Sequence, residues 1–517
     1  RLAVCLGICV CLSTPMTSQA KKLEKNPIML ELSTRPWLYA LSQKYSRDIS
    51  KLADIPDAEL DDIQKMGVHV VWFMGVWELG AYGLNHDRTD PGLLADYAKN
   101  LPGYTTDDII GSPYAIVDYK VNPSLGSAED LARLRGRLAS RGLGLCLDFV
   151  PNHSAVDAPY ATSNPDWYIQ QPDGEPFDPT RYLKVGNSSL AFGSDVYSGA
   201  WTDTLQWNYW NDDLRTHLVD AVANIAGMTD MIRCDMAMLE INAVYDKSWG
   251  DINRKNGFSP PSSEFWATAI QRARDVNPDI VFMAEAYVYG ITQQPEDVVL
   301  QSLGFDHTYD KTLLDDLHNG QSIPDYIKGR GGAFLDKTAH FLSNHDEPRA
   351  IPTLGGVANS EAGAAIVYTL PGLKMFWQGQ WQGYSNKLDV HLRRAKSESA
   401  LPEVTTFYQN FSAALNNPAF RAGWDEWKWV DTTSGMLAWY WDDGNQHKVL
   451  VAVNYSPNDN VFANIVLPDC TAKSGDNIEI RELIQGVSYQ RSASEIRSKG
   501  LGVLLSAWQA QVFDYSG

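Results

Sequence analysis

Long apolar runs separated by segments with helical spacing make up most of the chain. One run, residues 231–238, reads Met-Ile-Arg-Cys-Asp-Met-Ala-Met and follows a helix-like segment at residues 212–226. An apolar run after a crossover helix is typical of a buried parallel strand. Arg233 and Asp235 interrupt this run, and the two-residue period of a strand places both on one face. Because an isolated buried charge is costly, the two are expected to pair, either as a structural ion pair or within a functional site.

Three further apolar runs also end in polar residues. Residues 143–153 end in Pro-Asn-His, residues 279–287 carry Glu285 near their end, and residues 338–346 end in Asn-His-Asp. In a (β/α)8 barrel the catalytic residues collect at the carboxyl ends of the strands. Four such runs in one chain favour a shared site at that end over four unrelated structural charges.

The four stretches, in this chain order, resemble the signature regions of the α-amylase superfamily of glycoside hydrolases. The resemblance extends over residues 27–517, and the wording Gly111-Ser-Pro-Tyr and Asn344-His-Asp-Glu-Pro-Arg is similar to a bacterial-type, amylase-like branch. It implies an α/β fold, a (β/α)8 barrel with a small inserted domain after strand 3 and a C-terminal antiparallel β-sandwich.

The resemblance also implies roles for individual residues. Asp235 matches the nucleophile, Glu285 the general acid/base and Asp346 the third catalytic carboxylate. The candidate substrate-binding residues are Tyr114, Asp148, His153, Arg233 and His345, although Tyr114 can also be read as part of a packed turn. From the residues themselves, Arg233 should keep Asp235 ionised, and the apolar neighbours of Glu285 should raise its pKa.

The implied function is that of a retaining α-glycoside hydrolase acting on α-glucans or maltooligosaccharides. A transglycosylase, or a hydrolase of a short α-glucoside such as sucrose or trehalose, remains an alternative. A non-catalytic carbohydrate-binding or transporter-accessory barrel is disfavoured because all three carboxylates are present. Endo versus exo attack, bond position and oligomeric state are left open.

Two positions depart from the family pattern. Met238 and Leu239 stand where typical α-amylases have Lys and His on the acceptor side. The change puts in doubt both a standard acceptor side and one ligand of the usual calcium site. No cofactor is expected to be required, and structural calcium remains open with Asn152 as its candidate ligand.

The pattern divides the chain into four parts. Residues 1–20 contain an apolar run followed by Ser-Gln-Ala, the layout of a signal peptide and too short to span a bilayer, so the protein is expected to be secreted or periplasmic. The barrel is expected to take residues 21–153 and 208–421. Residues 154–207 lack clear periodicity and correspond to the inserted domain B, and short alternating runs from residue 422 to 517 predict the β-sandwich.

Within the barrel, strands and helices are expected to alternate. The strands are predicted at residues 27–41 (with the following loop), 68–77, 143–150, 231–238, 279–287, 305–314, 338–346 and 373–378. The helices are predicted at residues 57–66, 127–141, 212–226, 262–276, 359–370 and 405–415, with Ser127 as an N-cap. C-terminal strands are predicted at residues 427–430, 436–441, 449–454, 462–467 and 507–513.

Charge and cysteine content narrow the function classes. The formal net charge is −20 without a basic cluster, which argues against nucleic acid or an anionic membrane as a partner and suits a neutral substrate. Beyond the signal-peptide segment only Cys146, Cys234 and Cys470 remain. Strand parity places Cys146 and Cys234 on different faces, so neither a bridge between them nor a zinc site is expected.

Overall fold

Eight parallel strands close into a barrel in the computed structural model, which describes residues 22–467 and 477–516. The strands are hydrogen-bonded in the order β1-β14-β13-β12-β11-β10-β5-β2, which confirms the predicted fold class. Their bounds are β1 Ile28–Ser33, β2 Val70–Met74, β5 Gly144–Phe149, β10 Met231–Cys234, β11 Val281–Ala284, β12 His307–Tyr309, β13 Thr338–His340 and β14 Leu373–Trp377. The predicted signal peptide at residues 1–20 and Cys470 lie outside the described residues.

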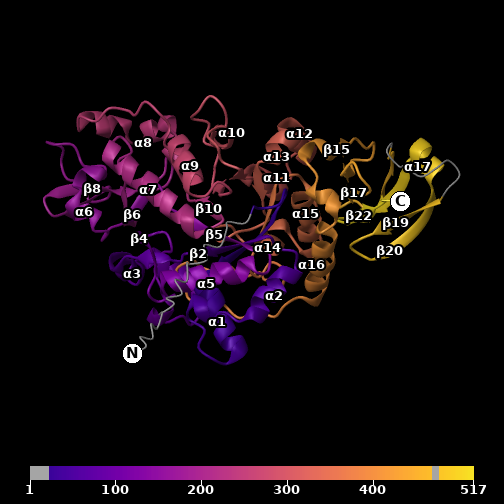
Figure 1. Cartoon of the computed structure of the whole chain (residues 1–517), viewed down its shortest axis with the longest axis horizontal. Helices are drawn as coiled ribbons and strands as arrows, with labels where there is room; N and C mark the ends of the chain where they lie inside the picture. Colours follow the sequence, from indigo (N-terminus) through magenta and orange to yellow (C-terminus); the bar gives the residue numbers. More distant parts are fainter. Residues whose placement is uncertain (1–21, 468–476, 517) are drawn as a thin grey trace, which may run out of the picture.

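Helices surround the barrel (Figure 1). They are α1 Thr34–Tyr45, α2 Asp57–Lys65, α5 Ala128–Ala139, α7 Asp212–Met228, α8 Asn242–Lys255, α9 Phe265–Val276, α10 Glu296–Ser302, α11 Lys311–Asn319, α12 Ile323–Arg330, α13 Gly332–Leu335, α14 Ala350–Leu354, α15 Val357–Thr369 and α16 Pro402–Leu415. The Ser127 side chain caps α5 by accepting a hydrogen bond from the Asp130 backbone N–H, as its sequence pattern predicts. Within residues 22–467 and 477–516, we find no helix with the length and apolar character needed to span a membrane.

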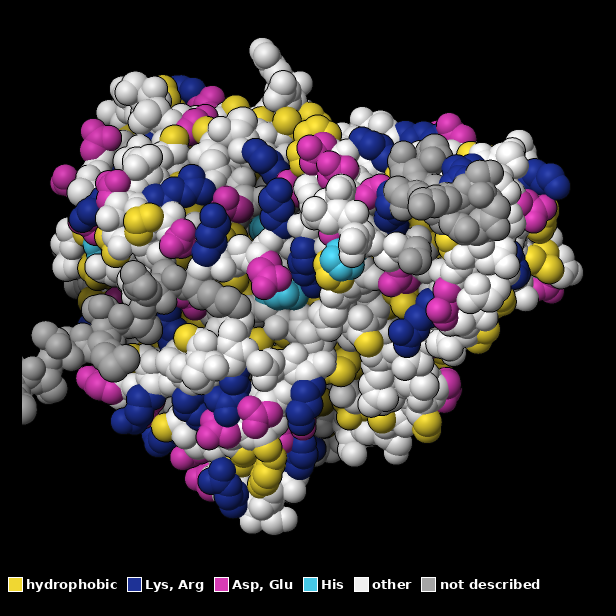
Figure 2. Space-filling view, turned by 45° about the vertical axis from the view of Figure 1, so that its right-hand side comes forward, with side chains coloured by type: hydrophobic (Ala, Val, Ile, Leu, Met, Phe, Trp, Pro, Cys, Tyr) yellow, Lys and Arg dark blue, Asp and Glu magenta, His cyan; other side chains and the backbone are white. Residues whose placement is uncertain are grey.

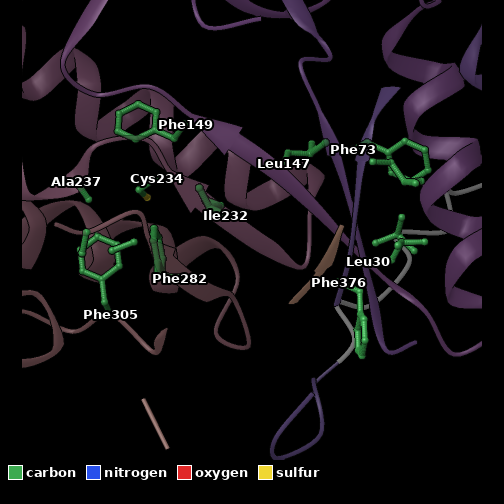
Figure 3. Packing of buried hydrophobic residues seen from close by; sticks show 14 of the residues in the cluster. Leu30, Phe73, Leu147, Phe149, Ile232, Cys234, Ala237, Phe282, Phe305 and Phe376 are labelled. Carbon is green, nitrogen blue, oxygen red and sulfur yellow. The ribbon is translucent and has the colours of Figure 1, made fainter. Parts of the chain in front are cut away.

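Alternation along the barrel strands produces two apolar cores. Side chains such as Met29, Trp72 and Met283 fill the barrel interior. Their neighbours in sequence point outward and pack beneath the surrounding helices; Leu30, Phe73, Leu147, Phe149, Ile232, Cys234, Phe282 and Phe376 belong to this outer core (Figure 3). Cys146 lies in the inner core and Cys234 in the outer one, and both are free thiols, as strand parity predicts. The same parity turns Glu31, Asp148 and Arg233 into the barrel, because each shares the face of an inward apolar neighbour.

The barrel strands are shorter than predicted, and for two of them the structure shows what ends the strand. The predicted strand at residues 305–314 ends at Tyr309, because the Asp310 side chain accepts a hydrogen bond from the Leu313 backbone N–H and begins α11. The predicted strand at residues 68–77 ends at Met74, where Gly75 adopts a φ of 75°. The chain then continues through β3 (Trp77–Leu79), α3 (Ala81–Asp87), α4 (Pro91–Asn100) and β4 (Ile116–Val121), and β3 pairs with β4.

The segment between β5 and α7 forms a separate antiparallel sheet. Its strands are β6 His153–Ala155, β7 Tyr182–Val185, β8 Ser188–Gly193 and β9 Trp201–Gln206, in the order β6-β9-β8-β7, with the short helix α6 Tyr160–Ser163 beside them. β8 and β9 are each buried along one half and half-exposed along the other, instead of alternating. This burial pattern explains why their sequences show no strand periodicity.

The C-terminal strands lie at the opposite end of the molecule from the inserted sheet (Figure 1). They form a six-stranded antiparallel sheet, β15-β16-β17-β22-β19-β20, and a separate pair, β18-β21. The bounds are β15 Trp427–Val430, β16 Leu437–Asp442, β17 Lys448–Val453, β18 Val461–Ile465, β19 Asn477–Glu482, β20 Val487–Ser492, α17 Ala493–Lys499, β21 Leu501–Leu505 and β22 Ala510–Asp514. The indole N–H groups of Trp439 and Trp441 donate to Thr369 at the end of α15 and fasten the sheet to the barrel.

Candidate active site

Arg233 is the centre of a charged cluster at the carboxyl ends of the barrel strands. Its side chain is fully buried, with Nη1 2.7 Å from Asp235 Oδ1 and Nη2 2.6 Å from Glu285 Oε2. The neighbouring strands β10 and β11 end with Cys234 opposite Ala284. The next residue of each chain segment, Asp235 and Glu285, therefore leaves the barrel at the same level. Arg233 thus pairs with Asp235, as the sequence predicts, and its guanidinium also contacts Glu285, which the sequence does not predict.

The backbone after Asp235 is shaped to hold Glu285. Met236 adopts a left-handed conformation, with φ 42° and ψ 38°, which is uncommon for a residue with a side chain. This conformation directs the Met236 N–H to Glu285 Oε2 at 2.8 Å. Tyr287 donates its hydroxyl to the other oxygen, Oε1, at 3.0 Å. Backbone strain of this kind, of order 1–3 kcal/mol, is found where surrounding contacts impose it, often at active sites.

Burial and charge give the two carboxyl groups different proton affinities. Burial raises the pKa of Glu285 to about 7; Arg233 opposes the shift, while the negative charges of Asp235 and Asp346 add to it. Burial also raises the pKa of Asp235, against the opposing charge and hydrogen bond of Arg233. The guanidinium thus favours the ionised form of Asp235, which is the direction that the sequence predicts. The pKa of Asp235 nevertheless remains above its ordinary value.

Asp346 belongs to a chain of hydrogen-bonded groups that ends at a carboxylate the sequence analysis missed. His345 Nε2 lies 3.0 Å from Asp346 Oδ2, and His345 Nδ1 lies 2.5 Å from Glu31 Oε1 on β1. Burial disfavours the imidazolium, but Asp346 and Glu31 outweigh it and raise the pKa of His345 to about 10. Burial likewise opposes ionisation of Asp346, yet the imidazolium lowers its pKa to about 2. Asp346 is thereby kept as an anion beside the other two carboxyl groups.

Tyr114 lies between the imidazole and the guanidinium. Its hydroxyl is 2.8 Å from His345 Nε2, and its ring stacks on that of His345 with centroids 5.5 Å apart. The guanidinium carbon of Arg233 lies 5.3 Å from the centroid of the Tyr114 ring. The ring also lines the cleft above the carboxylates. This position suits a platform beneath a sugar.

The remaining predicted site residues take different places. His153 lines the cleft, and burial lowers its pKa to about 4, so it is a neutral hydrogen-bonding group at neutral pH. Asp148 does not line the cleft; its carboxylate accepts hydrogen bonds from Trp72 Nε1 and the Gly75 N–H, each at 3.0 Å. A supporting role beneath Arg233, its partner in the strand register, fits Asp148 better than direct substrate contact.

A cleft of about 480 Å³ opens above the three carboxylates, within the usual size of a ligand site. Asp235, Glu285 and Asp346 line one part of it, together with Tyr114 and His153. The other part is lined by residues from α3, the start of α4, β9 and the segment after β14, namely His86, Asp87, Asp90, Leu93, Ala200, Trp201, Thr202, Asp203, Thr204, Val390 and His391. The inserted sheet and the loops of the barrel thus build its walls jointly.

A second cavity of about 390 Å³ begins at Met236, which lines both. Its other lining residues are Asp195, Tyr197, Ala286, Tyr287, Val288, Tyr289, Tyr309, Lys311 and others on the Glu285 side. Tyr197 is 70% exposed and stands edge-on to Tyr289. Met238 and Leu239, the two positions that depart from the family pattern, are buried and do not line this cavity.

The surroundings of Asn152 do not fit a calcium ion. Asn152 Oδ1 and its backbone oxygen both accept hydrogen bonds from Gln206 Nε2, each at 2.9 Å. Gln206 Oε1 accepts from the Ser194 N–H, so the amide is oriented with its N–H groups toward Asn152. Calcium needs six to eight oxygen ligands. Within the described parts of the chain, moreover, no three His, Cys, Asp or Glu side chains are grouped to hold a metal.

Comparisons with known proteins agree with this architecture. The family model described as the α-amylase catalytic domain matches residues 52–308. The α-amylase MalA of Haloarcula japonica is 26% identical over 369 residues, which cover 68% of this chain and 44% of that protein. An α-1,4-glucan:maltose-1-phosphate maltosyltransferase of Burkholderia pseudomallei is 25% identical over 53% of this chain and 20% of its own. The chain thus spans less than half the length of these two relatives.

A solved structure extends the likeness to the whole fold. The α-amylase of Lactobacillus plantarum superposes with a TM-score of 0.67 at 19% identity, covering 95% of this chain and 99% of that one. The sequence matches carry the family assignment, and the superposition extends the shared fold beyond the matched segment. The chain belongs to the α-amylase superfamily of glycoside hydrolases.

Proposed function

We propose that this protein is a retaining α-glycoside hydrolase that cleaves α-glucosidic bonds in α-glucans or maltooligosaccharides. One observation carries the proposal: Arg233 holds Asp235 and Glu285 together at the floor of a cleft that Asp346 also lines. Two carboxyl groups, one ionised and one protonated, are what double displacement at a sugar carbon requires. The relatives named an α-amylase and a maltosyltransferase support the choice of α-glucosidic bonds.

In the first step Asp235 attacks the anomeric carbon and forms a covalent glycosyl ester. The bond from that carbon to the bridging oxygen breaks, and Glu285 gives its proton to the departing oxygen. In the second step Glu285, now ionised, takes a proton from water, whose oxygen attacks the same carbon and releases Asp235. Asp346 and Asp235 offer negative charge to the cationic transition states, while Tyr114 supports the sugar ring.

The pKa of Glu285, raised to about 7, suits this exchange of roles. A carboxyl group with an ordinary pKa would be almost fully ionised at neutral pH and could not act as the acid. When Asp235 becomes an ester it loses its negative charge, so one contribution that raises the pKa of Glu285 disappears. Glu285 is then better able to remain ionised and to act as the base in the second step.

The alternative is transfer of the glycosyl group to a sugar in place of water, or hydrolysis of a short α-glucoside. The second cavity, with Tyr197, Tyr287 and Tyr289, has room and aromatic surface for an acceptor sugar. Incubation with maltoheptaose, followed by chromatography of the products, tests the proposal. Shorter oligosaccharides alone support hydrolysis of α-glucans, and products longer than the substrate support transfer. An unchanged substrate contradicts both of these and favours hydrolysis of a short α-glucoside.

The pH dependence should follow Glu285 on its alkaline side. We expect kcat/KM for maltoheptaose to fall above about pH 7, because Glu285 loses the proton that it must donate. On the acid side kcat/KM should fall as Asp235 becomes protonated. With α-glucosyl fluoride, whose leaving group needs little protonation, the alkaline fall should weaken. An alkaline limb identical for both substrates would contradict this assignment of Glu285.

We propose that no metal ion is needed for activity. The hydrogen bonds from Gln206 to Asn152 support this, as does the buried, apolar Leu239 at the position of a family ligand. Activity on maltoheptaose should survive exhaustive EDTA treatment followed by gel filtration. A complete loss that added calcium restores would refute the proposal.

We also propose that the protein is secreted or periplasmic. The proposal rests on the sequence of residues 1–20, an apolar run that ends in Ser-Gln-Ala before Lys21. Material recovered outside the cytoplasm should have an intact mass that begins at or near Lys21. Exported protein that still carries Arg1 would be inconsistent with cleavage here.

A further inference from the structure

The proposed reaction assigns the two cavities to the two sides of the cleaved bond. The reacting sugar must contact Asp235 and Asp346, so it lies in the cleft that these residues line together with Tyr114. Glu285 protonates the departing oxygen, and the second cavity begins with the residues beside and after it, Met236 and Tyr287. The leaving part of the substrate therefore lies in the second cavity. The glycone side extends from the carboxylates toward His86 and His391.

At the far end of the glycone side, hydrogen bonds join the elements that form or support its walls. His86 on α3 places Nε2 2.7 Å from Thr202 Oγ1 on β9, so the barrel connection meets the inserted sheet. On the other wall, Asn100 at the end of α4 donates its amide to Asp389 Oδ2 at 3.1 Å, just before His391. Both contacts join elements that line the cleft or lie directly behind its lining.

The segment behind His391 pairs in a strand-like way with residues 109–110. Ile109 and Leu392 form an antiparallel bridge, and the His391 carbonyl accepts a hydrogen bond from the Ile110 N–H at 2.8 Å. Asp108, buried except for 1% of its surface, forms ion pairs with Arg393 and Arg394 at 3.1 and 2.8 Å. The side chains of Tyr97, Leu101, Ile109 and Leu392 pack together as a small apolar core behind this end.

Polar groups line this end of the cleft. Asp87, Asp203 and His391 all line it, and the His391 ring is held by Asp389 at 3.0 Å. Burial lowers the pKa of His391, but Asp389, with smaller contributions from Asp87 and Asp203, raises it overall. Carboxylate acceptors and an imidazole donor are suited to the free hydroxyl groups of a terminal sugar. A sugar within a chain would instead need an exit for the next residue.

We infer that the glycone side is a dead end that accepts the free non-reducing end of an α-glucan, so that the enzyme attacks from chain ends. The inference rests on the proposed function and adds to it the mode of attack. The closure formed by His86 with Thr202 and by Asp108 with Arg393 and Arg394 is the specificity-determining feature. Oligosaccharides blocked at that end should be excluded from productive binding.

The test compares two forms of maltoheptaose. In one form the non-reducing end is free. In the other, a cyclic acetal joins the C4 and C6 hydroxyl groups of the glucose at the non-reducing end. Products are separated by chromatography. The wild-type enzyme should hydrolyse the free form and cleave the blocked form roughly 100-fold more slowly, because a small extra group meets the end wall. Equal rates on both forms would overturn the inference, whereas failure on both forms, and on α-glucosyl fluoride, would instead refute the proposed function.

A variant and its matched control test the residues assigned to the closure. Asp108→Ala removes the partner of two arginines without touching the catalytic groups, and it should raise the ratio of blocked to free cleavage about tenfold. Asp57→Ala removes another aspartate that pairs with two arginines, Arg137 and Arg141, outside the cleft, and it should leave the ratio unchanged. The same ratio in both variants would remove Asp108 from the closure. If Asp108→Ala does not fold, the wild-type comparison alone decides the inference.

Discussion

Replacing Asp235 or Glu285 by alanine should reduce hydrolysis of maltoheptaose by about 10⁴-fold or more, the scale seen when a covalent nucleophile or its partner is removed. The two variants are distinguished by how azide restores reaction with α-glucosyl fluoride. In Glu285→Ala the fluoride can still leave, Asp235 forms the ester, and azide then displaces Asp235. Two inversions give the α-glucosyl azide.

In Asp235→Ala the internal nucleophile is missing. Azide must enter from the vacated face, and a single inversion gives the β-glucosyl azide. The anomers, read from the coupling constant of the anomeric proton by NMR, therefore assign the roles directly. Observation of the opposite anomers would reverse the assignment of nucleophile and acid.

A matched control uses a carboxylate that lines neither cavity. Glu175 is a surface residue of the inserted segment and pairs with Lys255 at 2.7 Å. Glu175→Ala should hydrolyse maltoheptaose like the wild type and form no glucosyl azide beyond the wild-type level. Arg233 contacts both carboxyl groups, so this contact does not distinguish the nucleophile from the acid. The pKa of Glu285, raised to about 7, favours Glu285 as the acid.

The barrel could be predicted because most of its strands lie in apolar runs next to a helix, and parity then placed Arg233 inside. The contact between Arg233 and Glu285 could not, because it depends on the lateral pairing of β10 with β11, two strands separated by about 50 residues. The sequence of one strand fixes which side chains share a face. It does not fix the register of that strand relative to the neighbouring strand.

Glu31 is a site residue whose signal is present in the sequence. It interrupts the run Ile28-Met-Leu-Glu-Leu in the way that Arg233 interrupts β10, and its two apolar neighbours, Leu30 and Leu32, both point outward. A lone carboxylate in a buried strand therefore indicates a candidate site residue. The strand β19, Asn477–Glu482, likewise alternates cleanly between exposed and buried positions and was not predicted.

The net charge of the chain says little about the chemistry of the cleft. The chain carries 63 acidic and 43 basic residues, yet on the face in Figure 2 the two kinds are interspersed. Two acidic groups with an evident function, Asp235 and Glu285, are instead buried and both contact Arg233, while Asp346 lines the same cleft. Net charge alone is thus a poor guide to the chemistry of this cleft, which depends on where the charges are buried.

Glu31→Gln should lower kcat/KM for maltoheptaose by roughly 100-fold, the effect expected when a carboxylate that orients a histidine is lost. Glu31 is fully buried on β1, and its Oε1 lies 2.5 Å from His345 Nδ1. It touches no part of the cleft, so it acts as a positioning residue. Glutamine keeps the size and one acceptor oxygen but removes the negative charge that stabilises the imidazolium.

The loss of that charge should also change the pH profile. The pKa of His345, about 10 in the wild type, should fall, because only Asp346 then favours the imidazolium against the cost of burial. The imidazolium is present below the pKa of His345 and lost above it. With α-glucosyl fluoride, whose leaving group needs little protonation by Glu285, the variant should therefore lose activity at lower pH than the wild type. NMR titration of the His345 ring nitrogens follows the same change directly.

Glu59→Gln is the control, because Glu59 is also a largely buried carboxylate that accepts hydrogen bonds, from Lys44 and Tyr45, but it lies on α2 away from the cleft. It should leave the pH profile of kcat/KM unchanged. If Glu31→Gln lowered only thermal stability and kept the wild-type pH profile and His345 titration, Glu31 would be a structural group alone. A downward shift in both measurements, absent from Glu59→Gln, would establish that β1 sets the charge of His345 and, through it, the ionisation of Asp346.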